Sequence, residues 1–593
     1  MQRIVFRMLA GAMLAGVAPF AAAISPGVVI TQLSDIQQPN GDAAGLKVSA
    51  NGATLCFVAD RDTDEANELF CSDSGNPQTA TRISGLLPSG SAATYVTLSS
   101  DGSTVYYLAP ELNGNKVELF RAPTDGSSPA TRLNAQLLPP DGDVKSFELL
   151  EAQQKVIYSA AAETDNVFEL YVVDLAMPGQ ATKLSGPVVA SGTGVKQFRF
   201  DESTSRVYYT SEQQEVDKIE LYGNALAGGA LVKLNAPINS GEFIGSFGFI
   251  PGGAQIQYRV VPTTGPLNTW VASATQSGTA WRLNQTLQSN GSATVVTTSP
   301  DGSRIVFVAD ATVDSRFGLY SRALDGSEPL PVTIDSAIIE FPPMTLNTLP
   351  RVDYLDDNTL LYVDAYNNDG IGKLVTRDDE AASSPTVLSG SLDVGDYRIA
   401  GNRGEAVVAY DAAGVSNLAR VALDASGATP LTSIVANAGV IALSSIDPAG
   451  RYWVYLADPT VPDRRELFRI DLDAPGVTTL SSTASGFLGV NRASARSVVD
   501  GGWVCFDEDH FSSMTLISRW VLRCTGRTGV PVRDMAQMSA SIISSVERNY
   551  SEILPAPDTP DRVFYAADIP NDDQYEAYQS EINTLLFANG FED

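Results

Sequence analysis

Residues 299–307 read SPDGSRIVF, and the segment continues through Leu319-Tyr320 to Asp325-Gly326. The Asp-Gly pair supplies the positive φ that a tight hairpin needs, and the alternating apolar residues after it are typical of a half-buried strand. The same pattern occurs in residues 46–84, 96–134 and 443–482. The sequence therefore contains an internal repeat, and each copy predicts four short β-strands, here called a, b, c and d in chain order.

The repeat extends along most of the chain. Turns between strands a and b are expected roughly 50 residues apart, near Gly52, Gly102, Gln153, Thr204, Gly253, Gly302, Asn358, Gly404, Gly450, Gly501 and Asp561. Four-stranded units at this spacing are typical of β-propeller blades. We therefore expect an all-β fold, a β-propeller of about eleven four-stranded blades. Because rings usually hold about four to eight blades, we expect two rings, formed by residues 24–340 and 341–582.

The copies at 46–84, 96–134, 295–335 and 443–482 resemble the PD40-type, WD-like repeat of the TolB family of periplasmic proteins. The residues that carry the resemblance are the 299–307 segment, Leu319-Tyr320 and Asp325-Gly326. The resemblance implies an exported propeller that binds proteins or other ligands. It does not extend to the separate N-terminal α/β domain of that family.

The N-terminal segment, residues 1–23, has the pattern of a secretory signal peptide. Arg3 and Arg7 precede an apolar stretch at residues 8–20, and residues 21–23 are all alanine. We therefore expect a periplasmic or secreted protein that is not inserted in the membrane. Residues 583–593, at the other end, are expected to form a frayed C-terminal tail.

The four cysteines form two local pairs, Cys56 with Cys71 and Cys505 with Cys524. In each pair the first cysteine lies on an expected strand b and the second on the following strand c. Adjacent antiparallel strands bring such Cα atoms within about 5.5 Å, which suits a disulfide. The sequence therefore predicts two disulfides, as expected for an exported protein.

The N-terminal strand is expected to complete the last blade. Residues 30–34 read ITQLS and match the strands d at 80–84 (ATRIS) and 130–134 (ATRLN). The last copy contains strands b and c but no strand d after them. Since an unpaired sheet edge promotes aggregation, we expect residues 28–35 to supply the missing strand.

The charge is strongly acidic, with 39 basic and 69 acidic residues and a net charge of -30. Such a chain repels polyanions, which argues against nucleic acid as a partner. Acidic residues recur in the loops between strands b and c, and these loops share one face in a propeller. We expect an acidic binding face that meets a basic partner or a divalent cation, with candidate residues Asp310, Asp314, Asp458, Asp463, Asp568 and Asp572.

The first of these loops is the candidate metal site. Asp60, Asp62 and Asp64 have alternate spacing, and Glu65 follows them. Calcium prefers several oxygen ligands, so it is the candidate cation. Two features oppose this hypothesis: Glu65 stands where an EF-hand loop has glycine, and Arg61 lies within the loop.

No catalytic motif stands out. His510 is the single histidine, there is no Gly-x-Ser-x-Gly motif, and His510 is expected in a solvated loop between strands b and c. We therefore expect a non-enzymatic binding protein whose partner is an unidentified protein or small ligand outside the cytoplasm. The alternatives are a propeller enzyme, a hydrolase or lyase with its site at the ring pore, and a purely structural envelope protein.

Overall fold

The computed structural model describes residues 28–34, 42–75, 80–111, 116–189, 191–313, 316–340, 350–364, 371–434, 440–445, 449–458, 464–474, 476–481, 487–490, 496–497, 503–512, 517–526, 533–541, 551–555, 562–567 and 576–582. At residues 28–31, 312–313, 337–340 and 440–445, and from residue 487 onward, the description covers the backbone alone. The expected signal peptide and C-terminal tail lie outside the described residues. None of the described residues forms a helix with the length and hydropathy needed to cross a membrane.

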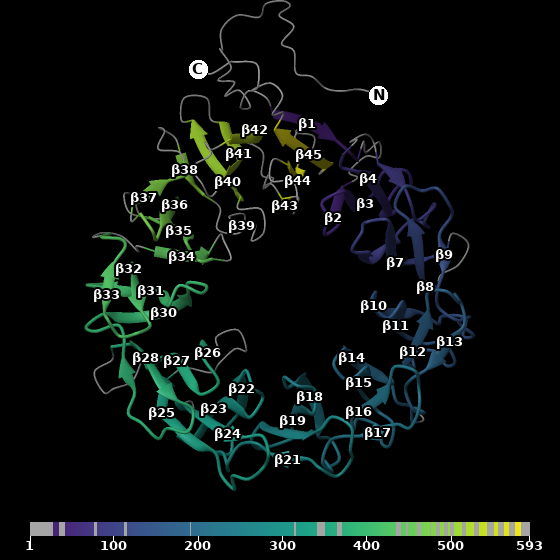
Figure 1. The fold of residues 1–593 in the computed structure, drawn as a ribbon. Coiled ribbons are helices and arrows are strands. Elements are labelled where there is room, and N and C mark those ends of the chain that lie inside the picture. The colour runs from purple at the N-terminus through teal and green to yellow at the C-terminus, as the bar shows by residue number, and fades with distance from the viewer. Residues whose placement is uncertain are drawn as a thin grey trace, which may run out of the picture. The chain divides into compact units, whose positions relative to one another are not determined.

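The described residues form antiparallel sheets in which consecutive strands lie side by side, as blades of a β-propeller do (Figure 1). The first sheet, for example, has the order β2-β3-β4-β5, which corresponds to strands a to d. Eleven such sheets are present in the described part of the chain, ten with four strands and one with five. The predicted all-β propeller fold is therefore confirmed.

The chain divides into two compact units. Unit 1 comprises residues 1–133, 401–403 and 434–593. Its strands are β1 (Val28–Gln32), β2 (Ala43–Val48), β3 (Thr54–Ala59), β4 (Glu68–Asp73), β5 (Thr81–Arg82), β6 (Thr94–Leu98), β7 (Thr104–Pro110), β8 (Val117–Pro123), β9 (Thr131–Arg132), β34 (Val440–Ser445), β35 (Tyr452–Ala457), β36 (Glu466–Asp471), β37 (Val477–Thr479), β38 (Phe487–Val490), β39 (Arg496–Ser497), β40 (Trp503–Ser512), β41 (Ile517–Gly526), β42 (Arg533–Ser541), β43 (Ser551–Pro555), β44 (Arg562–Ala567) and β45 (Glu576–Ile582).

Unit 2 comprises residues 134–400 and 404–433. Its strands are β10 (Val144–Leu150), β11 (Lys155–Ala160), β12 (Glu169–Asp174), β13 (Ala181–Lys183), β14 (Val195–Asp201), β15 (Arg206–Ser211), β16 (Glu220–Ala225), β17 (Val232–Lys233), β18 (Phe243–Phe249), β19 (Gln255–Val261), β20 (Asn268–Ser273), β21 (Trp281–Arg282), β22 (Ala293–Thr298), β23 (Arg304–Val313), β24 (Arg316–Ala323), β25 (Val332–Glu340), β26 (Val352–Tyr354), β27 (Thr359–Asp364), β28 (Lys373–Asp378), β29 (Thr386–Val387), β30 (Asp393–Ile399), β31 (Glu405–Ala412), β32 (Val415–Ala422) and β33 (Ala428–Pro430).

The turns between strands a and b show why the repeat folds as it does. Gly102 has a φ of 72°, and the Oγ of Ser99 accepts a hydrogen bond from the backbone N–H of Thr104 at 3.0 Å while donating to Asp101 at 2.6 Å. In copies that have lost the Asp-Gly pair, Gln154 and Ser205 take the left-handed conformation, with φ of 52° and 50°. The hairpin therefore survives the loss of its usual glycine, at the cost of some backbone strain.

Neighbouring sheets pack face to face through apolar side chains. In unit 2 one buried cluster contains Val306 and Leu319 from the sixth sheet and Val352 and Leu360 from the seventh. This cluster joins sheets on the two sides of residue 340, which lies inside unit 2. The number of rings that the sheets form, and a boundary near residue 340, stay predictions.

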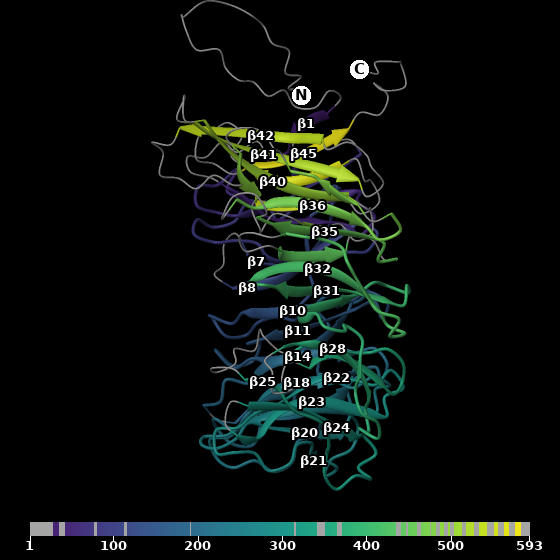
Figure 2. The same cartoon turned by 90° about the vertical axis from the view of Figure 1, so that its left-hand side faces the viewer.

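The N-terminal strand completes the last sheet of unit 1, as predicted. Strand β1 pairs with β45 in antiparallel register, with Val28 opposite Ile582 and Gln32 opposite Tyr578. Figures 1 and 2 both show β1 beside β45. Leu33 follows directly, is fully buried in the core of the first sheet, and accepts a backbone hydrogen bond from Ala80 at 2.9 Å. Residues 28–34 therefore connect the last sheet to the first.

Candidate binding face

In each unit the b–c loop of one sheet lies beside the connection that enters the next sheet. In unit 1 the N–H of Asn67 donates to Ser91 O at 2.9 Å, and the N–H of Ala93 donates to Asn67 O at 2.9 Å. In unit 2 the N–H of Val195 donates to Phe168 O at 2.7 Å in the same way. For the first two sheets we call residues 60–67 and 86–95 the loop edge.

The candidate calcium ligands do not converge. The side chain of Asp60 accepts a hydrogen bond from the backbone N–H of Glu65 at 3.0 Å, so it closes the loop on itself. Burial raises the pKa of Asp60, and the negative charge of Asp64 adds to this effect. Glu65 has a φ of 58°, so it adopts the left-handed backbone conformation that glycine takes at this position of an EF-hand loop.

Asp62 is held by two arginines. It accepts hydrogen bonds from Arg61 at 2.8 Å and from Arg82 at 2.6 Å. Burial alone would raise the pKa of Asp62, but the bonds and charges of both arginines outweigh it and lower the pKa. Among the described residues, no group of three or more acidic, His or Cys side chains is arranged to hold a metal ion.

Two candidate residues of the acidic face are buried. Asp310 and Asp458 are each only 3% exposed, and Asp310 accepts a hydrogen bond from the backbone N–H of Ser292 at 2.5 Å. Asp310 was expected in the loop between strands b and c, but it lies within strand β23, and its carboxylate binds the backbone just before strand a of the same sheet instead of facing solvent. Asp314, Asp463, Asp568 and Asp572 lie outside the described residues. The exposed acidic residues of the loop edge are Asp62, Asp64 and Glu65.

A buried glutamate begins strand c in several sheets. Glu220, with no exposed surface, forms an ion pair with Lys233 of strand d at 2.5 Å and accepts a hydrogen bond from Tyr222 at 3.1 Å. Glu169 likewise pairs with Lys183, and Glu118 with Arg132. The sequence shows the repeated glutamates but gave no sign of their partners, because the basic residues on strand d look like ordinary surface charges.

The first sheet departs from this pattern. Oε1 of Glu68 accepts a hydrogen bond from Thr63 at 2.7 Å, while Oε2 is buried and has no hydrogen-bond partner in the part of the chain that the structure describes. Arg82, on strand d, bonds to Asp62 instead. Glu68 is therefore a fully buried carboxylate that pairs with no cation of the described residues, unlike Glu118, Glu169 and Glu220.

Tyr95 is a feature that sequence reasoning missed. It lies in strand β6 at a bulge, has a φ of 52°, and is 59% exposed. A left-handed conformation is rare for a bulky aromatic residue. Nothing in the repeat marks this position, because the corresponding residue in the first sheet is Gly45 and in the third sheet Lys145.

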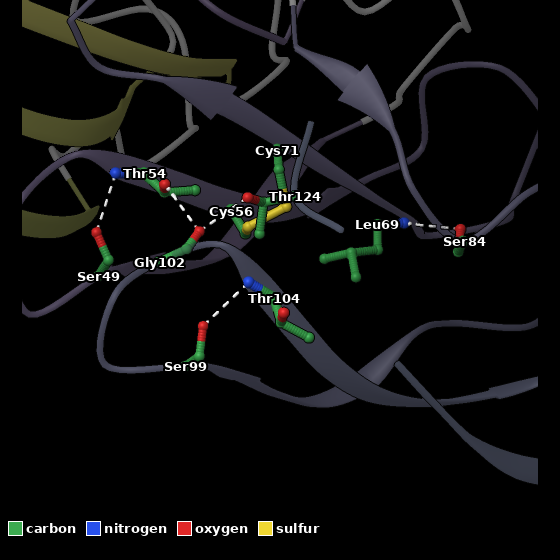
Figure 3. Close-up of a disulfide and its surroundings, with 10 residues drawn as sticks. All are labelled: Ser49, Thr54, Cys56, Leu69, Cys71, Ser84, Ser99, Gly102, Thr104 and Thr124. Carbon is green, nitrogen blue, oxygen red and sulfur yellow. Dashed lines mark hydrogen bonds between the residues drawn. A yellow bond between two sulfur atoms is a disulfide. The ribbon is translucent and has the colours of Figure 1, made fainter. Parts of the chain in front are cut away.

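The first predicted disulfide is present. Cys56 and Cys71 lie opposite each other on β3 and β4, with their Cα atoms 4.1 Å apart. Both are buried in the cluster that joins the first two sheets, beside the turn where Thr54 and Thr124 donate hydrogen bonds to Gly102 O at 3.0 and 2.8 Å (Figure 3).

The second cysteine pair has a matching register. Cys505 lies opposite Cys524 on β40 and β41, while the side chains of this region lie outside the description. His510 was expected in a loop, and this was wrong: it lies within strand β40, opposite Arg519. The run of acidic residues before it suggested a loop, but strands β40 and β41 extend their hairpin through it.

No protein-family model and no curated protein matches the chain. Among solved structures, a puromycin-hydrolyzing peptidase from Mycobacterium tuberculosis is 13% identical with a TM-score of 0.29, covering 64% of this chain and 61% of its own. An oligogalacturonate lyase from Vibrio parahaemolyticus is 13% identical with a TM-score of 0.29, covering 59% of this chain and 96% of its own. A protein described as TolB from Agrobacterium tumefaciens is 14% identical with a TM-score of 0.25, covering 48% of this chain and 90% of its own.

These similarities do not decide between an enzyme and a binding protein. The chain spans less than two thirds of the length of the peptidase, and each TM-score is low. The neighbours include a TolB protein, yet they do not assign this chain specifically to the TolB family.

Proposed function

We propose that the chain is an exported, non-enzymatic propeller protein that binds a basic protein or peptide through its loop edge. The observation that carries the proposal is that the side chains of Asp64 and Glu65 are exposed and have no counter-ion among the described residues. Their charges are therefore available to a partner.

Electrostatics favours a cationic partner. The net charge of -30 attracts basic molecules from a distance and speeds their association. A divalent cation is less suited to the same loop, because Arg61 and Arg82 already occupy the carboxylate of Asp62. Extended basic segments need only exposed carboxylates, which Asp64 and Glu65 supply.

Export is part of the proposal. The pattern of residues 1–23 supports it, and so does the disulfide between Cys56 and Cys71, since such bonds persist mainly in oxidising compartments.

A peptide titration tests the proposed function. A hexa-arginine peptide is titrated into the purified protein by calorimetry at low and high salt. We expect binding that weakens with salt, and weaker binding to the double variant Asp64→Asn, Glu65→Gln. The control variant Asp125→Asn, Glu202→Gln removes the same charge from turns at the opposite edge of their sheets. Equal losses in the two variants, or no binding to the unchanged protein, would contradict the proposal.

A further inference from the structure

Tyr95 combines strain with exposure. Its φ of 52° lies in the left-handed region, and 59% of its surface is open to solvent. Residues held in such conformations cluster at functional sites, where the surrounding structure compensates for the strain. The exposed ring gains little from burial, so packing does not account for its presence.

The first sheet has the same bulge without backbone strain. Gly45 stands at the bulge of strand β2 with a φ of 67°, a conformation that glycine adopts without steric cost. In the second sheet the same bulge holds a tyrosine instead. Folding alone would favour glycine at position 95, so the ring is better explained by contact with another molecule.

Five other aromatic rings in the described part of the chain have a cation of the chain itself over their face. Arg61 lies 3.9 Å from the centroid of the Phe70 ring, and Lys145 lies 4.9 Å from that of Phe168. Further pairs are Arg322 with Trp281, Arg351 with Tyr397 and Arg451 with Tyr452. No cation of the described part of the chain lies over the ring of Tyr95. Tyr95 is nevertheless more exposed than any of the aromatic residues in these pairs.

The segment that leads to Tyr95 is bonded to the acidic loop. The N–H of Gly90 donates to Glu65 O at 2.8 Å, and the N–H of Ala93 donates to Asn67 O at 2.9 Å. Tyr95 follows Ala93 by two positions, so its backbone is fixed close to the loop that carries the exposed Asp64 and Glu65. An exposed ring whose backbone is held close to a loop with exposed carboxylates is suited to a cationic group.

We propose that Tyr95 is the aromatic anchor of the loop edge and that it receives an arginine or lysine side chain of the basic partner on its ring face. This inference rests on the proposed function and specifies how the partner is recognised. The ring supplies a cation–π contact, and the carboxylates of Asp64 and Glu65 attract the same partner electrostatically.

Binding and stability of two variants test the anchor. Tyr95→Gly removes the ring and relieves the backbone, so the melting temperature is expected to rise while the affinity for hexa-arginine falls about two- to fivefold. Tyr95→Phe keeps the ring face and should retain most of the affinity. The matched control is Leu138→Ser, which removes another exposed apolar side chain, 66% exposed, and should leave the affinity unchanged.

The outcomes separate the anchor from the proposed function. Unchanged hexa-arginine affinity in Tyr95→Gly would overturn the anchor alone, because the binding face would still stand on the Asp64 and Glu65 variants. An equal loss in Tyr95→Phe would also overturn it, since the hydroxyl rather than the ring would then be responsible. Failure of the unchanged protein to bind the peptide would overturn both. A neutral hexa-citrulline peptide should not bind, and if it bound as well as hexa-arginine the cationic contact would be wrong.

Discussion

Arg82 donates a hydrogen bond to Asp62 at 2.6 Å and so does not neutralise Glu68, the buried glutamate at the start of strand c in the same sheet. At the corresponding positions in the fourth sheet, Lys233 pairs with Glu220. The same glutamate position therefore has a counter-ion in the fourth sheet, whereas in the first sheet no described residue supplies one. Burying a charge without a partner costs free energy of folding. Removing one member of a formed buried pair costs free energy too, because it leaves the other charge without a partner.

Glu68→Gln is expected to leave the free energy of unfolding unchanged or to raise it by up to about 1 kcal/mol. The amide oxygen can still accept the hydrogen bond of Thr63, and no ion pair with a described residue is lost. Glu220→Gln is expected to lower the free energy of unfolding by about 1–3 kcal/mol, because Lys233 loses its counter-ion. Urea unfolding of both variants at neutral pH checks this, and equal losses would contradict the distinction between the two sites.

Removal of the first strand should damage the last sheet. Deleting residues 28–32 leaves the edge of β45 unpaired along the register that β1 now occupies. We expect a clearly lower melting temperature and a tendency to aggregate. Calorimetry and light scattering measure the two effects. A truncated protein that melts and scatters as the full chain does would show that the pairing contributes little.

Loss of the disulfide in the first sheet should also destabilise the protein. Cys56 and Cys71 are 15 positions apart. Replacing both by alanine is expected to lower the free energy of unfolding by about 3 kcal/mol on the loop-entropy model.

Alkylation of the native protein followed by mass spectrometry tests both cysteine pairs. All four thiols should react only after reduction, and labelling of Cys505 or Cys524 before reduction would refute the second disulfide.

Asp379 should make stability depend on pH. Burial raises its pKa and nearby Glu380 and Asp378 add to this, although Tyr354, which donates a hydrogen bond at 2.8 Å, and Arg304 act in the opposite direction. A raised pKa in the folded state stabilises the protein at low pH, and this contribution is lost as the pH rises through that pKa. Asp379→Asn mimics the protonated acid.

The variant should therefore be more stable than the unchanged protein at neutral pH, and the difference should shrink as the pH falls to about 4. Unfolding in urea over this pH range gives the measurement. A difference that grows on acidification would show that the pKa of Asp379 is lowered and not raised.

The sequence specified the fold well because the repeat is encoded locally. Positive φ at Gly102 and Gly302 follows from the Asp-Gly pairs themselves, and the match of residues 30–34 to other strands d located the closing strand. The site was harder to predict. The sequence shows that Asp310 is acidic. It does not show that Asp310 is buried and accepts a hydrogen bond from the backbone N–H of Ser292, because this contact forms only when the two segments are brought together by folding.

Tyr95 illustrates the same limit. The bulge that turns it outward is a property of two paired strands, since Thr94 pairs with Leu108 but Thr97 pairs with Tyr106. A single sequence shows alternation within one strand and not the slip between two. The strain and exposure of Tyr95 are therefore visible only after folding.

The pairing of β1 with β45 also sets the order in which the protein can mature. Because a chain is synthesised from its N-terminus, residues 28–32 emerge long before residues 576–582, with which they pair. Until then the first strand has no partner within its own sheet. A chain that is interrupted at any point before residue 576 keeps this strand unpaired, so only a chain that extends through residue 582 can protect the strand from chaperones and proteases.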